Sequence, residues 1–322
     1  MRTLISSPHR IAWIDAPEPS LGAGEVLLKP LAVGVCGSDL HVFEGQHPFV
    51  GYPVYPGHEV AARVVETGPG VDAAWRGALV ALEPSITCGD CAACRGGRYN
   101  ICESLQVMGF QAPGAMAEAF VTRPRFLHRL PEGFDAELGA MVEPLAVAVH
   151  AVLLSEVRGR KVGVLGAGTI GLLVAQVAKA YGAAGVEAVD LLDSRRNLAE
   201  SLGVQAKLPD SAKYDTIFEC VGTERALEAA IQGVRKGGNI IVLGVHGRPA
   251  ALSVGLIQDW EIGIKGSLMY TYRDYQEAIR LFANGQVQGK PLVTHRFALS
   301  EVGRAFAAAL ERQTALKVML HG

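Results

Sequence analysis

The sequence predicts an α/β protein with two domains, one rich in β-strands and one built on a doubly wound parallel sheet. The first observation is the length of 322 residues, which exceeds the size at which a single core usually stops growing. The second is residues 1–130, where short β-like runs alternate with glycine and proline and show little helical periodicity. The third is the later chain, where apolar strand-like runs alternate with amphipathic helical segments. We place the domains at 1–148 and 149–286, with 287–322 returning to the first domain.

The composition is that of an ordinary globular protein and excludes two classes of partner. Hydrophobic residues make up 49% and charged residues 19% of the chain, and the formal net charge is −2. Such a chain offers no basic surface for nucleic acid or for an anionic membrane. The N-terminal stretch lacks the apolar core of a signal peptide, and no run of about 20 apolar residues is present to span a bilayer. We therefore expect a cytoplasmic protein, in which metal binding explains clustered cysteines better than disulfides do.

The β-rich region contains a cysteine, a histidine and a carboxylate that together form a candidate catalytic site. Cys36 stands at the end of an apolar run in VGVCGSDLH, and Ser38 and His41 follow it closely. His58 and Glu59 enter the next strand-like run in PGHEV. All three residue types ligate zinc, and three protein ligands leave one position open for catalysis. A lone histidine beside a glycine is more often structural, so this prediction depends on the combination.

Four cysteines in the run CGDCAACRGGRYNIC form a second candidate metal site. They are Cys88, Cys91, Cys94 and Cys102. The glycines between them allow the short turns that bring four thiolates to one point. The alternative is a set of loose reduced thiols, for which this spacing is too specific. A site closed by four thiolates has no open position, so we predict a structural zinc here.

A carboxylate interrupts the long apolar run ELGAMVEPLAVAVHAVLL, which is compatible with a helix. Glu143 is followed there by Pro144. A carboxylate in such surroundings is costly unless it is paired or reaches a metal. The alternative is a glutamate that caps backbone amides at a helix start. The residues alone leave both interpretations open.

A dinucleotide-binding signature follows in KVGVLGAGTIGLLVAQVAKAYG, which reads as a strand, a glycine-rich turn and a helix. Gly166 permits the tight turn, Gly168 lets the backbone approach a pyrophosphate, and Gly171 lets the helix pack closely on the strand. Asp190 ends the next strand-like run, nineteen residues after the last glycine. Its carboxylate would accept hydrogen bonds from the adenosine ribose.

The same carboxylate bears on the choice of cofactor. Asp190 would repel a 2′-phosphate, so we predict NAD rather than NADP. The nearby Arg195 and Arg196 leave the strictness of this preference open. Strand-like and helical segments then alternate as far as DYQEAIRLFANG, which continues the doubly wound pattern. The link LPDSAKYDT is unusually short for this pattern and is expected to lack a helix.

Taken in order, these motifs resemble those of the zinc-dependent medium-chain alcohol and polyol dehydrogenases, in the branch of sorbitol and threonine dehydrogenases. The resemblance covers nearly the whole chain, through CGSDLH, PGHE, the four-cysteine run, VEPLAVAVHA, GAGTIG and KPLVTHRF. It implies a GroES-like catalytic domain that holds two zinc ions and a Rossmann domain that binds NAD. It also implies a homo-oligomer, either a dimer or a tetramer.

The resemblance assigns the metal ligands residue by residue. Cys36 and His58 would ligate the catalytic zinc, and Glu59 and Glu143 would be alternating carboxylate ligands or near neighbours. Which of these two glutamates completes the zinc sphere stays open. The four-cysteine run would hold the structural zinc.

The resemblance also assigns proton-transfer and cofactor-binding residues. Ser38 would relay the substrate proton and His41 would pass it towards solvent, as expected beside a metal that acidifies a bound alcohol. The family's NAD-contacting positions are matched here by Ile170, Asp190 and Arg195.

Departures from the family pattern concern the substrate. The segment GSLMY matches a phenylalanine-arginine-tyrosine run of sorbitol dehydrogenases, but Met269 replaces the arginine that helps to hold the polyol, and only Tyr270 is kept. Val42 follows His41 where a tyrosine is frequent. These differences weaken an assignment to sorbitol. We expect a broadly apolar substrate pocket with contributions from Phe49, Met116 and Met269.

The predicted function is the oxidation of a secondary hydroxyl of a polyol, sugar, sugar acid or hydroxy amino acid to a ketone, with NAD as hydride acceptor. One alternative is a non-catalytic protein that binds zinc and NAD in a regulatory or structural role. Another is a zinc-free relative of the quinone reductases. The intact Cys36, His58 and Glu59 argue against both, because neither needs an open metal position.

Overall fold

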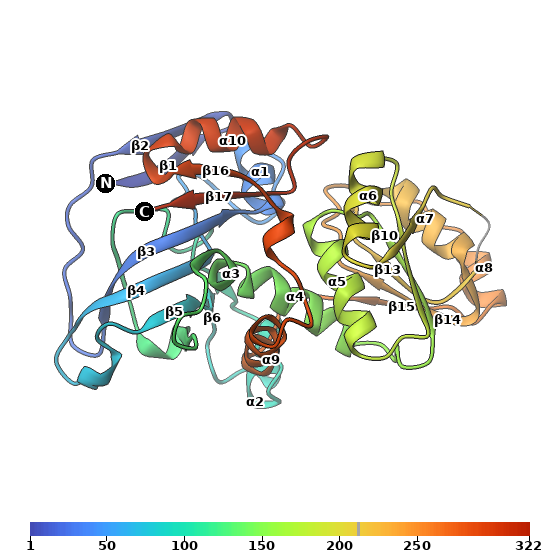
Figure 1. The fold of residues 1–322 in the computed structure, drawn as a ribbon, viewed down its shortest axis with the longest axis horizontal. Coiled ribbons are helices and arrows are strands. Elements are labelled where there is room, and N and C mark those ends of the chain that lie inside the picture. Colours follow the sequence, from blue (N-terminus) through green and yellow to red (C-terminus); the bar gives the residue numbers. More distant parts are fainter. Residues whose placement is uncertain (211–212) are drawn as a thin grey trace. The chain divides into compact units, whose positions relative to one another are not determined.

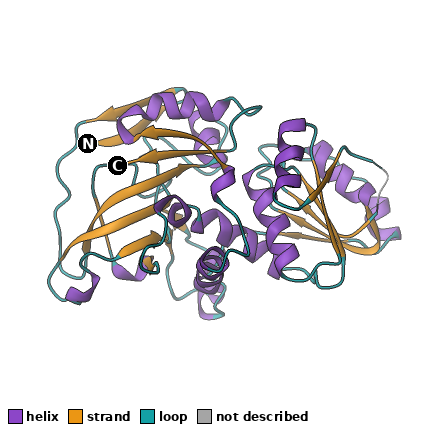
Figure 2. Ribbon diagram, viewed as in Figure 1, coloured by secondary structure: helices purple, strands orange, loops and turns teal. Residues whose placement is uncertain are grey.

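The structure, a computed structural model, describes residues 1–210 and 213–322 and divides into two compact units (Figure 1). Unit 1 comprises Met1–Glu143, Ala278–Ala283 and Leu292–Gly322, and unit 2 comprises Pro144–Glu277 and Asn284–Pro291. Long strands dominate unit 1, whereas strands and helices alternate in unit 2 (Figure 2). The domain boundaries that we place after residues 148 and 286 remain a proposal.

A seven-stranded sheet forms the framework of unit 1 (Figure 1). Its strands in spatial order are β16 (Val293–Ala298), β17 (Lys317–His321), β3 (Val26–Val35), β4 (Glu59–Thr67), β5 (Leu79–Leu82) and β9 (Leu127–Arg129), and β8 (Phe120–Thr122) also pairs with β3. All neighbours are antiparallel except β16 and β17. The C-terminal strand β17 therefore lies directly beside β3.

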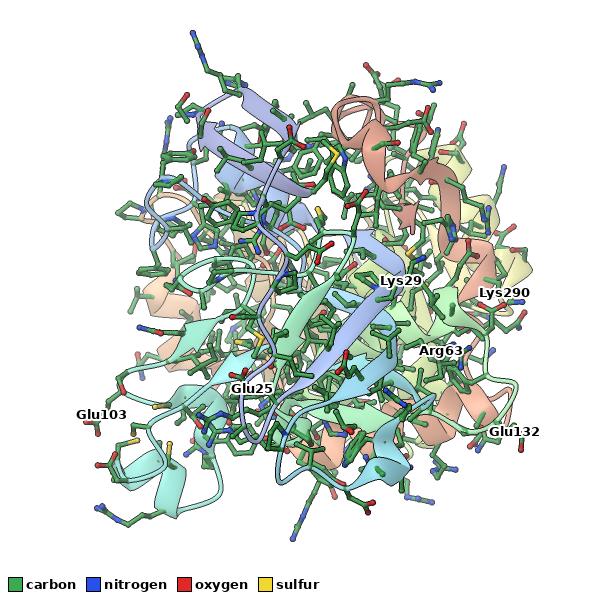
Figure 3. The ribbon with its side chains drawn as sticks, turned by 90° about the vertical axis from the view of Figure 1, so that its left-hand side faces the viewer. Glu25, Lys29, Arg63, Glu103, Glu132 and Lys290 are labelled. Atoms are coloured by element: carbon green, nitrogen blue, oxygen red, sulfur yellow. The ribbon has the colours of Figure 1, made fainter. Side chains whose placement is uncertain are left out.

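Side-chain alternation along β3 decides which groups enter the core of unit 1. Val26 and Leu28 are fully buried, whereas Lys29 is exposed beside its cross-strand partner Arg63 (Figure 3). Helix α10 (Val302–Leu310) adds Phe306 to the same hydrophobic cluster. One apolar cluster thus joins the first strands of unit 1 to its last helix.

Smaller elements of unit 1 lie around this sheet. They are the hairpin of β1 (Arg2–Ser7) and β2 (Arg10–Ile14), helices α1 (Gly37–Phe43), α2 (Ala92–Arg95) and α3 (Ala136–Ala140), and the antiparallel pair of β6 (Ser85–Ile86) and β7 (Gln106–Val107). The pairing of β6 with β7 closes the base of a lobe, defined here as residues 87–105, that contains all four clustered cysteines. The lobe is therefore tied to the unit at both of its ends.

Unit 2 is built on a six-stranded parallel sheet, and the predicted α/β class is confirmed. The strands in spatial order are β12 (Gln205–Lys207), β11 (Gly185–Val189), β10 (Lys161–Leu165), β13 (Tyr214–Glu219), β14 (Val234–Val242) and β15 (Gly263–Gly266). The helices are α4 (Val142–Leu153), α5 (Thr169–Ala180), α6 (Asp193–Ser201), α7 (Glu224–Gly233), α8 (Val254–Asp259) and α9 (Tyr272–Ala283). The first two residues of α4 and residues Ala278–Ala283 of α9 belong to unit 1. The strand order reverses after β10, which is the topology of a doubly wound fold.

The connection between β12 and β13 carries the shortened link expected from LPDSAKYDT. Its described residues 208–210 and 213 contain no helix, and residues 211–212 lie outside the described part of the chain. Polar contacts gather on the strands beside it: Glu187 accepts hydrogen bonds from Lys207 at 2.5 Å and from the Tyr214 hydroxyl at 2.9 Å. Within residues 1–210 and 213–322, no helix is long and apolar enough to cross a bilayer.

Candidate functional site

Two neighbouring strands bring the first set of predicted metal ligands together. Cys36 follows β3 and caps the start of α1, while Glu59 is the first residue of β4. In the antiparallel register Gly34 lies opposite Glu59, and a Cβ added to Gly34 would lie 2.0 Å from its Oε2. The ligand atoms of Cys36, His58 and Glu59 all lie within 4.8 Å of one another. We call these three residues the open set, because three ligands leave a coordination position free.

A buried carboxylate, not anticipated from the sequence, holds the imidazole of His58. Asp39 is fully buried, its Oδ1 lies 3.5 Å from His58 Nδ1, and its Oδ2 accepts a hydrogen bond from the Cys36 amide at 2.9 Å. Burial by itself lowers the pKa of His58, but Asp39 and Cys36 outweigh it and raise that pKa well above its usual value. Burial raises the pKa of Asp39, which His58 opposes. Asp39 thus faces His58 across 3.5 Å, in the place that carboxylates behind metal-binding histidines occupy.

A buried lysine holds Glu59. Lys317, the first residue of β17, is 3% exposed, and its Nζ lies 2.6 Å from both carboxylate oxygens of Glu59. It also donates to the Val35 carbonyl at 3.3 Å. Burial lowers the pKa of Lys317, but the charges of Glu59 and Cys36 prevail and raise it. The only sequence signal for this role is a lysine at the start of an otherwise apolar strand.

Glu143 lies in the first turn of α4 and is buried. Among the described residues, the ligand atoms within 4.8 Å of one another at this site belong to the open set alone, and Glu143 lies outside that set. Its charge nevertheless raises the pKa values of His58 and Lys317. Glu143 is therefore an electrostatic neighbour of the open set in this structure.

The two predicted proton-transfer residues lie on one helix beside the open set. The Ser38 hydroxyl lies 3.7 Å from the Cys36 thiol. His41 follows Ser38 by three residues in α1, so both side chains project from the same helical face. Both are partly exposed. Asp39 lies between them in the sequence but faces His58, so His41 is the titratable side chain that shares the helical face of Ser38.

The rings of His47, Phe49 and Phe110 form an aromatic wall beside His58, and of these only Phe49 was predicted as a pocket residue. The Phe110 ring lies 4.9 Å from that of His58 and 5.3 Å from that of His47, measured between centroids. Phe49 is 80% exposed, as expected for a residue at a pocket rim. Met116 is 1% exposed and belongs to the hydrophobic core, and its contribution to the substrate pocket stays a prediction.

The donor atoms of the open set fit a zinc ion. A thiol, an imidazole and a carboxylate are the ligand types that zinc accepts in tetrahedral sites with an open position. His58 Nδ1 and Asp39 Oδ1 are both buried without a hydrogen-bond partner in the described chain. Because Nδ1 of His58 faces Asp39, its other ring nitrogen, Nε2, is directed to the thiol of Cys36. A divalent cation would compensate the buried carboxylates that surround it.

The four cysteines of the lobe form a second and closed set, defined as Cys88, Cys91, Cys94 and Cys102. Their sulfur atoms lie within 4.8 Å of one another, and all six cysteines of the chain are free of disulfides. Backbone amides point at the sulfurs: the Cys88 amide donates to Cys102 Sγ at 3.4 Å and the Cys91 amide to Cys88 Sγ at 3.4 Å. Such hydrogen bonds lower the pKa values of Cys91 and Cys102. Four convergent sulfurs with amide donors fit a structural zinc.

A buried polar network, also not anticipated from the sequence, ties the lobe to the sheet of unit 1. The Tyr99 hydroxyl, in the lobe, donates to Glu83 Oε1 at 2.6 Å. Glu83 Oε2 lies 2.6 Å from Nε2 of His128, and both side chains are almost completely buried. Glu83 follows β5 and His128 belongs to β9, which are neighbouring strands. The lobe is thus anchored by a contact that does not involve its sulfurs.

In unit 2 the glycine-rich turn has the geometry that the signature predicts. Gly166 has a φ of +92°, in the region that favours glycine. A Cβ on Gly171 would lie 1.8 Å from the Gly166 carbonyl oxygen, so only glycine lets α5 begin so close to β10. Gly168 caps α5 and has open space around its Cβ position, and Ile170 follows in the first turn. The turn therefore presents backbone amides at a helix start, where a pyrophosphate binds.

Asp190 stands at the end of β11 beside this turn. Its carboxylate accepts hydrogen bonds from the amides of Ala167 at 2.8 Å and Leu192 at 2.9 Å, and it lies 3.5 Å from the Arg195 guanidinium. Arg196 donates to the Asp190 carbonyl at 2.7 Å. Arg196 is therefore engaged with the backbone, while Arg195 lies against the carboxylate.

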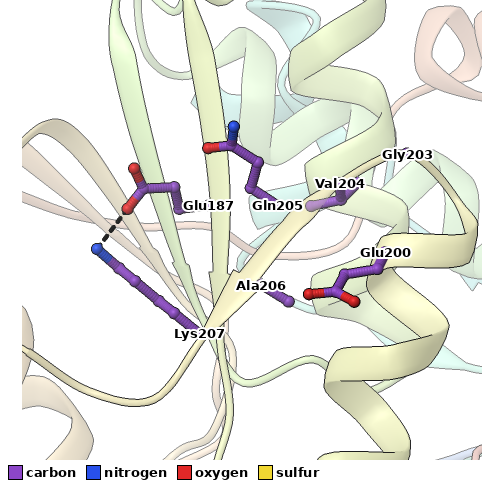
Figure 4. Close-up of a pocket in the computed structure, with 7 residues that line it drawn as sticks. All are labelled: Glu187, Glu200, Gly203, Val204, Gln205, Ala206 and Lys207. Carbon is purple, nitrogen blue, oxygen red and sulfur yellow. Dashed lines mark ion pairs between the residues drawn. The ribbon is translucent and has the colours of Figure 1, made fainter.

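A cavity of about 530 Å³ lies at the β12 edge of unit 2, apart from these sites (Figure 4). It is lined by Glu187, Glu200, Gly203, Val204, Gln205, Ala206 and Lys207. Two of its charged side chains, Lys207 and Glu187, form an ion pair with each other. None of the predicted site residues lines it, so we do not connect it with catalysis.

Comparison with known protein families matches both parts of the chain. Residues 22–132 match the family model described as the alcohol dehydrogenase GroES-like domain. Residues 169–284 match the model described as zinc-binding dehydrogenase. The first match contains the open set and the lobe, and the second contains Asp190 and all of α5.

Individual relatives extend this similarity over nearly the full length. The chain is 36% identical over 300 residues to 2-dehydro-3-deoxy-L-galactonate 5-dehydrogenase of Pseudoalteromonas atlantica, with 88% of each chain covered. It is 34% identical over 343 residues to sorbitol dehydrogenase of Halalkalibacterium halodurans, with 99% of each covered. A solved alcohol dehydrogenase of E. coli CFT073, in complex with NADH, aligns with a TM-score of 0.93 at 28% identity, covering 100% of this chain and 98% of that one.

Proposed function

The chain belongs to the family of zinc-dependent medium-chain alcohol and polyol dehydrogenases, and from this premise we propose that its substrate is a polyol or sugar acid. As a member it oxidises a secondary alcohol to a ketone, with zinc and NAD as cofactors. The substrate class is supported by the relatives that act on a sugar acid and on sorbitol. The observation that carries the proposal is the open set, which stands beside Ser38 and His41. The non-catalytic alternative finds no support among the relatives.

We assign each step of the reaction to this chain's own residues. Bound at the open set, zinc supplies a Lewis acid for the substrate hydroxyl, and NAD supplies the hydride acceptor. Cys36 and His58 hold the metal, with Glu59 as the proposed third ligand. Ser38 Oγ accepts the proton of the substrate hydroxyl and passes it to His41, which releases it to solvent.

The charged residues behind the open set keep it in the form that binds a metal. Asp39 faces the nitrogen of His58 that points away from Cys36, and Lys317 contacts both carboxylate oxygens of the buried Glu59. Glu143 adds a further negative charge and is the alternative carboxylate ligand. Glu59 or Glu143 would complete the ligand set of a zinc ion held by Cys36 and His58, and Lys317 contacts both oxygens of Glu59.

For the cofactor we propose a preference for NAD over NADP. Asp190 follows β11 where the ribose hydroxyls are expected. Of the two arginines near it, Arg195 lies 3.5 Å from its carboxylate and Arg196 donates to its backbone carbonyl. Gly166, Gly168, Ile170 and Gly171 shape the turn, and Arg195 contacts the nucleotide from its place beside Asp190.

We further propose a cytoplasmic homo-oligomer, dimeric or tetrameric. All four residues of the edge strand β15 are exposed, so it offers unpaired backbone groups together with the exposed side chain of Ile264. A second copy could extend the parallel sheet there, and light scattering on the purified protein would measure the assembly. The clustered free thiols support a reducing compartment.

Metal analysis and a substrate screen test the central proposal. We expect two zinc ions per chain and formation of NADH when polyols or sugar acids are added, with slower turnover when NADP replaces NAD. L-Threonine and simple secondary alcohols are included to define the class. Two zinc ions without oxidation of any alcohol would instead favour the non-catalytic protein.

A further inference from the structure

The segment that follows α1 carries a histidine for which the motifs and the proposed chemistry provide no role. The backbone amides of Gln46 and His47 donate to the His41 carbonyl at 2.7 and 3.1 Å. These bonds fold the segment back over the end of α1, next to a proposed proton-transfer residue. His47 is partly buried there, although it belongs to a loop.

His47 is part of the aromatic wall beside the open set. Its ring lies against Phe110 at 5.3 Å and an interplanar angle of 30°, and Phe110 in turn lies 4.9 Å from His58 at 41°. A single phenyl ring therefore separates His47 from a proposed metal ligand. The Gln111 side chain donates to the Phe49 carbonyl at 3.2 Å. This bond connects the loop that carries Phe110 to the loop that carries His47.

The hydrogen bonding of His47 determines what it offers to a ligand. Its Nδ1 accepts a hydrogen bond from the Phe49 amide at 3.3 Å. With Nδ1 as acceptor, the proton of a neutral imidazole resides on Nε2, which is then a donor. Within the described part of the chain, no group accepts a hydrogen bond from Nε2. The Nε2–H of His47 is thus a donor of fixed position in the wall, and no described residue accepts a hydrogen bond from it.

We propose that His47 determines specificity, with its Nε2–H donating to a hydroxyl or carboxylate oxygen of the substrate on a carbon beyond the reacting one. The inference rests on the proposed function and assigns a residue to the recognition of the second polar group that a polyol or sugar acid carries. A substrate that displaces water from this donor without offering an acceptor is penalised, so a monohydroxyl alcohol would bind less well than a polyol. His47 acts in this account through substrate binding and not through proton transfer.

The test compares a pentitol with 2-pentanol, which share chain length but differ in the additional hydroxyls. His47→Phe keeps a planar ring on Phe110 but removes the donor. We expect the ratio of kcat/KM for the pentitol to kcat/KM for 2-pentanol to fall about tenfold, mostly through a higher KM for the pentitol. His47→Asn, which retains a shorter donor, should recover part of this ratio. His9→Phe is the control, because His9 is an exposed histidine that also packs on a phenylalanine ring.

A second readout does not require turnover. Calorimetry measures the Kd of the pentitol for the zinc- and NADH-loaded protein, and we expect about tenfold weaker binding by His47→Phe. An unchanged ratio in a protein that does oxidise secondary alcohols would overturn the role of His47 and leave the proposed function intact. If no alcohol is oxidised, the proposed function fails and only the Kd comparison tests His47. The inference is then rejected if the unmodified protein and His47→Phe bind the pentitol equally, or if neither binds it.

Discussion

The open set and the closed set contain similar ligands but are supported in different ways. His58 and Glu59 of the open set are buried, and each is held by a charged side chain from elsewhere in unit 1. In the closed set the sulfurs receive hydrogen bonds from backbone amides of the lobe itself, and Cys88 is exposed. One site depends on long-range electrostatics and the other on local chain geometry.

This difference follows from what each site has to do. A site with an open position needs ligands whose charge and orientation persist when the fourth partner changes, and buried partners such as Asp39 and Lys317 provide this. A closed site exchanges nothing, so short turns and amide donors are sufficient. The comparison predicts that the two sites fail in different ways when they are altered.

The largest contrast is expected between Cys36→Ser and Cys94→Ser. Cys36→Ser should abolish turnover and remove one zinc. The unfolding temperature should change little, because the open set binds its metal for catalysis and not to hold the fold together. Cys94→Ser should keep the catalytic zinc but lower the unfolding temperature and the yield of folded protein, because metal binding by the lobe is part of its folding free energy. Zinc content, NADH formation and thermal unfolding are measured on both.

An equal loss of soluble protein in both variants would contradict this division. The same would hold if Cys94→Ser lost both metals while it remained folded. Cys220→Ser is the matched control, since Cys220 is a cysteine of unit 2 that belongs to neither set.

The proton path should show a loss of roughly 10²–10⁴ in kcat for Ser38→Ala, the scale for a positioned proton-transfer group. Ser38 contacts the reacting oxygen in the proposed mechanism, so added buffer cannot replace it. His41→Gln should be milder, most severe at low pH, and partly rescued by imidazole buffers. Rates over a pH series with and without imidazole measure this. A uniform change in His41→Gln that ignores pH and buffer would remove His41 from the path.

Lys317→Met tests the long-range support of the open set in the metal-free protein. It leaves Glu59 buried without its partner, and loss of one member of a buried ion pair costs about 3–5 kcal/mol in the free energy of unfolding. Adding Glu59→Gln should recover part of this loss, because the uncompensated charge is then removed. Urea unfolding measures both, with Lys29→Met as the exposed control on the same sheet. No difference between Lys317→Met and Lys29→Met would show that the pair is not a support.

The sequence was sufficient for the parts of the site that are encoded locally. Spacing between ligands and glycines predicts the closed set, the turn at Gly166 and the helix after it, because each arises within one short segment. The alternation of strands and helices likewise predicts the parallel sheet. The open set needed the combination of two motifs, which an antiparallel strand pair then brings together.

The remainder could not be predicted, because it consists of contacts between distant segments. Lys317 reaches Glu59 only because β17 pairs with β3, and no periodicity in the sequence reports that pairing. Phe110 lies against His58 through the path of a loop. The close approach of Met116 to Gly57, the residue before His58, is a contact of the same kind. Contacts of this kind require the fold.

The smallest effect is expected for Tyr99→Phe, which tests whether the lobe also has a long-range support. The Tyr99 hydroxyl donates to Glu83, whose other oxygen is engaged by His128. Without this hydroxyl, Glu83 Oε1 loses a hydrogen bond, and we expect the free energy of unfolding to fall by about 1.5 kcal/mol. Tyr55→Phe is the control, because the Tyr55 ring under Arg2 is kept in that variant. Both variants are unfolded with urea while zinc is bound. If they unfold at the same urea concentration, the lobe is stabilised by its own turns and its metal and not by the Tyr99 network. The closed set would then have no long-range support, in full contrast to the open set.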